Sequence, residues 1–244
     1  MKCALVVGGA RGIGLSIAVE LSKRDDIEKV YIVDKVPVLA EYLVGKIESY
    51  EFDLTNADYG IFDKFKGIDT LIITAGFGKL ALFRDESDDS IQKYFNVNTL
   101  PAIRLIKRYY DKLEGDSDFY CGVIVSIAGF MSSPFFSLYG ATKAALKIFI
   151  ESVNVELLKA GSTNRILNVS PGYIKGTSFS GGKTELLQTS ELARDIIEVL
   201  ERKEDLFIPQ YDTVYKAVLD RYHNDYRKEG IHSYEYKLES GRVK

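Results

Sequence analysis

The fold of this chain is decided near its start, by the stretch Cys3-Ala4-Leu5-Val6-Val7-Gly8-Gly9-Ala10-Arg11-Gly12-Ile13-Gly14. An apolar run ends in glycines, and residues 13–24 then carry apolar side chains at helical spacing. Glycine permits a tight turn and lets backbone amides approach a pyrophosphate at the amino end of a helix. The spacing differs from G-x-G-x-x-G, but strand, turn and helix follow in the order that such a site requires. The stretch predicts a dinucleotide-binding unit; the alternative is a glycine-rich turn without a ligand.

The rest of the chain repeats this order of strands and helices. Further strands are predicted at 30–33, 47–52, 70–74, 123–126, 165–169 and 206–208. Long helices are predicted at 88–113, 139–160 and 190–202, the last with Ser190 as its N-cap. Apolar strands separated by helices are typical of a parallel sheet buried on both faces. We therefore predict an α/β fold, a Rossmann-type doubly wound parallel seven-stranded sheet with helices on both faces, as one domain over residues 1–210.

Two segments depart from this regular pattern. The connection between Asp34 and Asp53 is short and contains Pro37, so its crossover helix is predicted to be stunted. Residues 211–244 form a separate C-terminal region. There, an amphipathic helix is predicted over 212–229, with Gly230 as its stop, followed by an aromatic tail. We expect this region to pack on its own domain or on a neighbouring subunit; the alternative is that the tail also covers the substrate.

Composition excludes several kinds of chemistry. The 244 residues include only two His and two Cys, and both His lie close to the C-terminus. Nucleophilic sites built on a positioned imidazole are therefore not expected, nor is a zinc site, which needs about four nitrogen, sulfur or oxygen ligands together. No metal site is predicted. Two cysteines in a chain of this size favour a reduced compartment, and we predict a cytoplasmic protein.

Charge and hydropathy exclude several partners. There are 32 basic and 35 acidic residues, a net charge of −3, which leaves no electrostatic footprint for nucleic acid. No apolar run approaches the roughly 18 residues of a membrane span. No nucleic-acid or membrane partner is predicted.

Asp34 ends the predicted second strand. A carboxylate there can accept hydrogen bonds from the ribose hydroxyls of an adenosine, and it repels a 2′-phosphate. This favours NAD as the cofactor. Arg11 and Lys35 are cations that can receive a 2′-phosphate, so NADP stays the less favoured alternative.

The stretch Tyr139-Gly-Ala-Thr-Lys143 begins a predicted long helix. Residues four apart lie one turn apart on the same helix face. A nearby ammonium favours the phenolate and lowers a tyrosine pKa that normally lies near 10. A tyrosine tuned in this way can exchange a proton with a carbonyl or alcohol oxygen. The same spacing is common by chance, and a pair on the helix surface is the alternative.

Taken in order along the chain, these motifs resemble the compact branch of the short-chain dehydrogenase/reductase family. The resemblance extends from Leu5 to about Ile208. It rests on Gly8-x-x-x-Gly12-Ile13-Gly14, Asp34, Asp53-Leu54, Ala75-Gly76, Asn98, Ser126, Tyr139-x-x-x-Lys143 and Pro171-Gly172. It implies a Rossmann-type enzyme that interconverts a carbonyl and a secondary alcohol by hydride transfer with NAD or NADP.

The resemblance also implies four catalytic residues. Tyr139 would be the general acid/base, and Lys143 would hold the nicotinamide ribose and lower the tyrosine pKa. Ser126 would bind the substrate oxygen, and Asn98 would hold a water linked to Lys143. The serine has alternatives in Ser132 and Ser133, because the strand before Ser126 begins late.

Other residues are implied to bind the cofactor. These are the glycine loop with Arg11, and Asp34, Asp53, Leu54, Ala75, Gly76, Tyr139, Lys143, Pro171, Ile174 and Thr177. Two departures weaken the match. Ile73-Thr74-Ala75-Gly76 stands where the family has Asn-Asn-Ala-Gly, and the segment from Pro171 to Thr177 is one residue longer than usual.

Several large apolar side chains lie near the predicted catalytic residues in the sequence. Aromatic and Met side chains are expected to form an apolar wall around the substrate, or else to pack in the core or a subunit interface: Phe130, Met131, Phe135, Phe136, Tyr173 and Phe179. Residues 177–187 are expected to form a lid over the substrate.

The two longest helices are expected to pair in a homodimer or homotetramer. Two competing functions are a dinucleotide-binding sensor or scaffold without turnover, which usually loses the Tyr or the Lys, and a dehydration or epimerisation at the same site.

Overall fold

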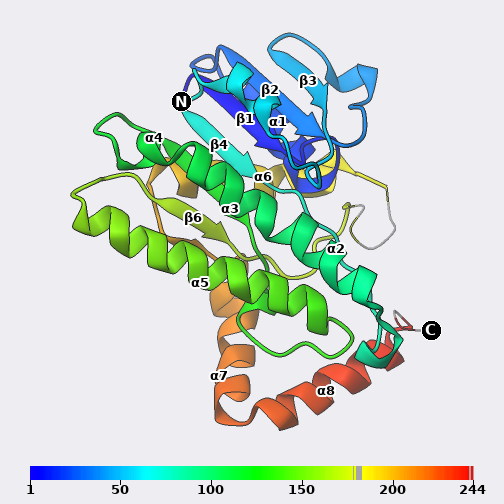
Figure 1. Ribbon diagram of the computed structural model, residues 1–244. Helices are drawn as coiled ribbons and strands as arrows, with labels where there is room; N and C mark the ends of the chain where they lie inside the picture. Colours follow the sequence, from blue (N-terminus) through cyan, green and yellow to red (C-terminus); the bar gives the residue numbers. More distant parts are fainter. Residues whose placement is uncertain (178, 180–182, 242, 244) are drawn as a thin grey trace.

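The computed structural model describes residues 1–177, 179, 183–241 and 243. Within them, a parallel sheet of seven strands runs in the order β3-β2-β1-β4-β5-β6-β7 (Figure 1). The strands are β1 Cys3–Val7, β2 Lys29–Asp34, β3 Ile47–Glu51, β4 Thr70–Ile73, β5 Tyr120–Ile124, β6 Ile166–Val169 and β7 Leu206–Phe207. The order reverses beside β1, which pairs with both β2 and β4. Ligands of doubly wound sheets bind at the carboxyl ends of strands where the order reverses, so this edge is where a site is expected.

Successive residues of β1 face opposite layers, as the two-residue period of a strand requires. Ala4 and Val6 pack in one core with α1 (Gly12–Ser22) and α6 (Leu186–Glu201). Leu5 and Val7 pack in the other core. That core includes residues of α3 (Leu100–Arg108) and α5 (Ser137–Lys159), which lie in front of the sheet in Figure 1. The predicted doubly wound sheet with helices on both faces is confirmed.

The prediction of a single helix over 88–113 is wrong. The structure has three helices there: α2 (Asp88–Asn98), α3, and α4 (Tyr110–Glu114). The break after α2 falls at Thr99, whose φ of −121° and ψ of −60° are not helical. Pro101 follows in the first turn of α3, where its missing N–H is tolerated but where it cannot continue the hydrogen bonds of α2.

Other boundaries shift by a few residues. β5 begins at Tyr120, earlier than the predicted residue 123. Helix α6 begins at Leu186, so Ser190 lies inside the helix and is not its N-cap. The connection from β2 to β3 holds only a short 3₁₀ turn, Ala40–Tyr42, which confirms the stunted crossover.

The C-terminal region also differs from the prediction. A π-helical turn, Tyr211–Tyr215, leads into α7 (Lys216–Asn224) and then α8 (Tyr226–Glu239). Asp225 has an extended backbone, and its carboxylate accepts hydrogen bonds from two amides at the start of α8. This N-cap starts a new helix, so the predicted helix over 212–229 is divided. Gly230 lies within α8 and does not end a helix.

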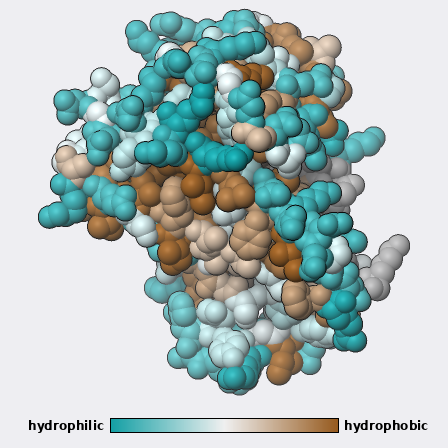
Figure 2. All heavy atoms as spheres, in the orientation of Figure 1, coloured by the Kyte–Doolittle hydropathy of each residue, from teal (hydrophilic) through white to brown (hydrophobic). Residues whose placement is uncertain are grey.

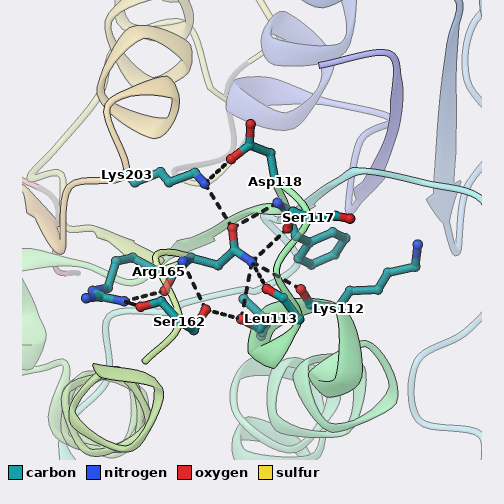
Figure 3. Close-up of polar contacts among 10 residues, drawn as sticks. Lys112, Leu113, Ser117, Asp118, Ser162, Arg165 and Lys203 are labelled. Carbon is teal, nitrogen blue, oxygen red and sulfur yellow. Dashed lines mark hydrogen bonds and ion pairs between the residues drawn. The ribbon is translucent and has the colours of Figure 1, made fainter. Parts of the chain in front are cut away.

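The amino ends of β5 and β6 are tied together by the fully buried side chain of Asn164. Its amide nitrogen donates, over 3.0–3.3 Å, to the carbonyl oxygens of Lys112, Leu113, Gly115 and Ser117. Its Oδ1 accepts from the Phe119 amide and from Lys203 Nζ, both at 3.0 Å. Figure 3 shows Leu113, Ser117 and Lys203 converging here from separate elements. This hub lies at the opposite end of the strands from the site described below.

The described helices include none that is both long and apolar enough to cross a membrane. Apolar side chains do gather on the surface. Figure 2 shows them across the middle of the face on which α3 and α5 lie. The large apolar residues exposed on these two helices are Leu100, Ile148, Val155 and Leu158.

Candidate active site

The glycine loop joins β1 to α1 at the carboxyl end of the sheet. Gly8 has a φ of +86° and Gly12 one of +54°, both in the left-handed region that favours glycine. A Cβ on Gly14 would lie 2.4 Å from Thr74 Oγ1, and one on Gly8 would lie 2.4 Å from the amide nitrogen of Ala75. Thr74 Oγ1 donates to the carbonyl of Gly8 at 2.8 Å. Thr74, which stands where the family has Asn, therefore still fastens β4 to the glycine loop.

The amide of Gly12, at the start of α1, points toward an oxygen. It donates to Thr184 Oγ1 at 2.9 Å. The Thr177 side chain lies close by, 3.6 Å from where a Cβ on Gly12 would stand. Ile13 packs on the core below, and Arg11 is exposed. Thr184 was missed by sequence reasoning, because nothing local in the sequence shows that it returns to the glycine loop.

Asp34 ends β2 beside the glycine loop. Its Oδ2 accepts from the amide of Ala10 at 3.0 Å and its Oδ1 from that of Val36 at 3.3 Å. The carboxylate is thereby held at the place where the sequence predicts the adenosine ribose.

Asp53 and Leu54 lie in the turn that follows β3. Asp53 Oδ1 accepts from the amide and the hydroxyl of Thr55, both at 2.8 Å. These bonds lower the pKa of Asp53, and the charge of Lys35 lowers it further. Leu54 packs on the core, and its carbonyl accepts from the Tyr59 hydroxyl at 2.7 Å. The turn is thus fixed by its own contacts, with the Asp53 side chain at the surface.

Lys143 and Asn98 meet at the carboxyl end of β4. Lys143 is 3% exposed, and its Nζ donates to the carbonyl of Ile124 at 2.9 Å. Asn98 ends α2, and its side chain makes two hydrogen bonds of 2.9 Å with the backbone of Phe77. A Cβ on Gly76 would lie 3.4 Å from both Asn98 Oδ1 and Lys143 Nζ. Residues far apart in the sequence are therefore brought together beside Gly76.

Ser126, Tyr139 and Lys143 form the polar centre of the site. Ser126 is buried, its Oγ accepts from the Ala128 amide at 3.1 Å, and its side chain lies beside the Tyr139 phenol. Lys143 Nζ lies 5.7 Å from the centroid of the Tyr139 ring. The alternative serines face elsewhere.

Those alternatives, Ser132 and Ser133, lie against α8. Ser133 Oγ accepts from Lys237 Nζ at 2.7 Å. Ser132 Oγ would lie 3.7 Å from a Cβ on Gly230. Of the three candidate serines, Ser126 is the one whose hydroxyl adjoins the phenol.

Burial dominates the electrostatics of this centre. It raises the pKa of Tyr139 to about 12, and the Ser126 hydroxyl only partly opposes this. Burial also lowers the pKa of Lys143 to about 8. The tyrosine pKa is thus raised, the opposite direction to the one expected from the spacing of Tyr139 and Lys143. The reason is that burial disfavours the phenolate, and that Lys143, with its pKa lowered to about 8, is already neutral at the pH where this phenol would ionise.

Replacing Lys143 by Met should stabilise the fold near pH 7. Unfolding returns the lysine pKa from about 8 to 10.5, so between these values the unfolded chain binds a proton that the folded chain lacks. Stability therefore rises with pH across this window, and the charged lysine opposes folding below it. We expect Lys143→Met to raise the free energy of unfolding by about 1–3 kcal/mol at pH 7, with the gain shrinking toward pH 10.

Denaturant unfolding at several pH values measures this, with the exposed Lys159→Met on the same helix as the control. A Lys143→Met variant that is less stable than the wild type at pH 7, or equally stable at every pH, would contradict the prediction.

Two aromatic rings pack against Tyr139. Their centroids lie 5.2 Å (Phe136) and 5.3 Å (Phe179) from that of Tyr139. Phe130 lies instead under Lys147, and Tyr173 is 55% exposed. The predicted lid over 177–187 includes residues 178 and 180–182, which lie outside the described residues.

The Pro171-Gly172 segment is held by both the site and the C-terminal region. The carbonyl of Pro171 accepts from the Ile127 amide at 3.0 Å and from Ser126 Oγ at 3.4 Å. A Cβ on Gly172 would lie 1.5 Å from the hydroxyl of Tyr215, so only glycine fits there. Further along, the carbonyl of Ile174 accepts from Thr177 Oγ1 at 3.0 Å. Tyr215, like Thr184, was missed by sequence reasoning.

In the described part of the chain, no group of three or more His, Cys, Asp or Glu side chains could hold a metal ion. Both the buried polar centre and the glycine loop lie at the carboxyl ends of the strands. This is the end of the sheet where a doubly wound fold binds a dinucleotide.

The chain is similar to several known proteins, and the solved structures among them share its fold. Retinol dehydrogenase 8 of Bos taurus is 26% identical, over 85% of this chain and 70% of its own. A short-chain dehydrogenase/reductase from Burkholderia phymatum, solved with NAD, has a TM-score of 0.77 at 17% identity, covering 92% and 93% of the two chains. An alcohol dehydrogenase from Thermococcus sibiricus, solved with 5-hydroxy-NADP, has a TM-score of 0.71 at 21% identity, covering 85% and 95%.

The family assignment rests on a further match. Residues 2–186 fit the family model described as short chain dehydrogenase, a span that begins before β1 and includes the glycine loop and the Tyr139–Lys143 pair. Since the fold, the ordered motifs and this match agree over most of the sequence, the chain belongs to the short-chain dehydrogenase/reductase family.

Proposed function

We propose that this protein is an oxidoreductase that interconverts a carbonyl and a secondary alcohol with NAD(H) or NADP(H), using Tyr139 as general acid/base. The observation that carries the proposal is the buried cluster of Ser126, Tyr139 and Lys143 beside Asn98 and Gly76. A buried phenol next to a buried ammonium suits proton exchange with a substrate oxygen. No other cluster of side chains described above offers this chemistry.

The glycine loop and its surroundings fit a dinucleotide. The Gly12 amide already donates to an oxygen, that of Thr184, as it would to a phosphate. The Asp34 carboxylate, which accepts from the amides of Ala10 and Val36, would also accept from the ribose hydroxyls. Gly8 and Gly14 let the loop pack closely on Thr74 and Ala75. Ala75 and Gly76 would then line the cofactor, with Pro171, Ile174 and Thr177 on its other side. When bound, the nicotinamide supplies or accepts the hydride.

The protein's own residues would carry out the proton transfer to and from the substrate oxygen. With a pKa raised to about 12, the Tyr139 phenol holds its proton near neutral pH, which suits donation to a carbonyl oxygen during reduction. Ser126 would hold that oxygen beside the phenol. Lys143, with a pKa near 8, would bind the nicotinamide ribose and share a proton with the phenol in the oxidative direction. Asn98 fixes the backbone of Phe77 beside them.

The substrate is proposed to be apolar. The rings of Phe136 and Phe179 adjoin the phenol, and a relative acts on retinol by its name. Consumption of NADH with a panel of apolar ketones, aldehydes, acyl thioesters and sugar-derived carbonyls tests the function. A sensor or scaffold without turnover would bind NADH and reduce none of them.

We expect the protein to bind NADH more tightly than NADPH. The Asp34→Ala substitution should reduce the difference between these two affinities. The carboxylate can accept from two ribose hydroxyls and repels a 2′-phosphate, so its loss should weaken NADH binding by about tenfold. Fluorescence titration with both cofactors measures this, with the exposed Asp25→Ala as the control. Equal affinities of the wild type for the two cofactors would overturn the NAD preference.

The subunit arrangement and the location of the protein stay predictions. The exposed apolar side chains of α3 and α5 support self-association through this face, as a homodimer or homotetramer. A cytoplasmic location is proposed from the low cysteine content alone.

A further inference from the structure

The segment 133–136, which leads into α5, contains a strained residue. Phe135 has a φ of +66°, an unfavourable conformation for a bulky side chain. Such a conformation persists only where the surrounding structure holds it. Phe135 is 5% exposed, and its carbonyl accepts from the amide of Ala81 at 2.9 Å. One hydrogen bond alone does not account for the conformation.

Helix α8 supplies further contacts to this segment. The ring of Tyr234 stacks on that of Phe135, with centroids 4.6 Å apart and planes at 28°. Lys237 Nζ donates to Ser133 Oγ and to the carbonyl of Pro134, both at 2.7 Å. Lys237 is 8% exposed. Tyr234 and Lys237 are three residues apart, so both project from the same face of α8.

The held segment touches the proposed acid/base. Lys237 Nζ lies 5.5 Å from the centroid of the Phe136 ring, within the range of a cation–π contact. The Phe136 ring packs in turn on Tyr139, and it lies 6.4 Å from the ring of Phe179. A chain of contacts therefore runs from α8 through residues 133–136 to the phenol.

We propose that Tyr234 and Lys237 are positioning residues for the substrate. They hold residues 133–136 in a strained conformation that presents Phe136 as one wall beside Tyr139. The proposal rests on the proposed function, because it concerns the substrate side of the same site. In this arrangement α8 contributes to the active site of its own chain, through its contacts with the backbone and rings of residues 133–136.

Two variants test the proposal independently. Lys237→Met keeps the aliphatic stem and removes the ammonium, and Tyr234→Leu removes the stacked ring. The exposed Lys228→Met, on the same helix, is the matched control. Thermal unfolding first establishes that each variant is folded.

Hydrogen exchange gives a readout that needs no turnover. The Phe136 amide donates to the Ser133 carbonyl, and the Ala81 amide donates to that of Phe135. In both variants these two amides should exchange at least about tenfold faster, while those of β1 and β4 stay unchanged. Rates equal to those of Lys228→Met would overturn the proposal.

Kinetics tests the link to substrate. With NADH and the carbonyl of the panel that the wild type reduces fastest, both variants should raise KM by about tenfold and leave kcat within about threefold. NADH affinity should not change. Faster exchange with an unchanged KM would refute the substrate role. Faster exchange in the variants, with no NADH consumption by the wild type on any carbonyl, would support the α8 contacts and contradict the proposed function instead.

Discussion

Tyr139→Phe is expected to lower kcat for carbonyl reduction by about 10³-fold, because a positioned general acid contributes roughly 10²–10⁴ to the rate. The ring would remain, so its packing against Phe136 and Phe179 would be kept. NADH affinity should stay within about twofold of the wild type, because the interaction lost is one made in the transition state. Steady-state kinetics and a fluorescence titration of NADH measure the two quantities.

The chain offers a closely matched control in Tyr109. It is also buried, burial also raises its pKa to about 12, and its hydroxyl donates to the carbonyl of Phe62 at 3.3 Å. It lies in the core beneath α3, outside the site. Tyr109→Phe should therefore keep full kcat. If Tyr139→Phe retained kcat within tenfold, the acid would have to be another group.

Asn164→Ala is expected to destabilise the fold by about 3 kcal/mol or more. The variant leaves the buried Phe119 amide and the partly buried carbonyls of Gly115 and Ser117 without their partner, and an unsatisfied buried group costs about 1–3 kcal/mol. It also removes one of the two hydrogen-bond partners of Lys203 Nζ, the other being Asp118 (Figure 3). Urea unfolding measures the loss, with the exposed Asn224→Ala as the control.

Asn164→Ala should lower the stability of the fold without weakening the binding of NADH. Asn164 lies at the amino end of the sheet, so the folded fraction of Asn164→Ala should bind NADH with nearly wild-type affinity below the unfolding transition. A loss of stability no greater than that of Asn224→Ala would show that water replaces the amide and that the hub contributes little.

The central part of the sheet could be predicted from sequence because its strands are buried on both faces. Runs such as Ala4–Val7 and Val30–Val33 are apolar throughout, and the glycine loop and the Tyr139–Lys143 pair lie at fixed places relative to them. The helix breaks were less visible. Thr99 and Asp225 end helices through backbone conformations that no apolar pattern marks, whereas Gly230 looked like a stop and lies within α8.

The electrostatics and the long-range contacts could not be predicted. The spacing of Tyr139 and Lys143 suggested that the lysine lowers the tyrosine pKa. The direction is set instead by burial, which depends on every element packed around the pair. Thr184, Tyr215 and Lys237 each reach a partner far away in the sequence. Their local sequence carries no sign of those partners.

The contact between Gly172 and Tyr215 limits the order in which these two positions can evolve. A side chain at 172 would overlap the tyrosine hydroxyl, so alanine there requires that Tyr215 first move or be replaced by a smaller residue. The reverse order has no such barrier, since a smaller residue at 215 leaves glycine acceptable at 172. Relatives that keep a tyrosine at this place should therefore keep the glycine, while those that have lost the tyrosine are free to vary both.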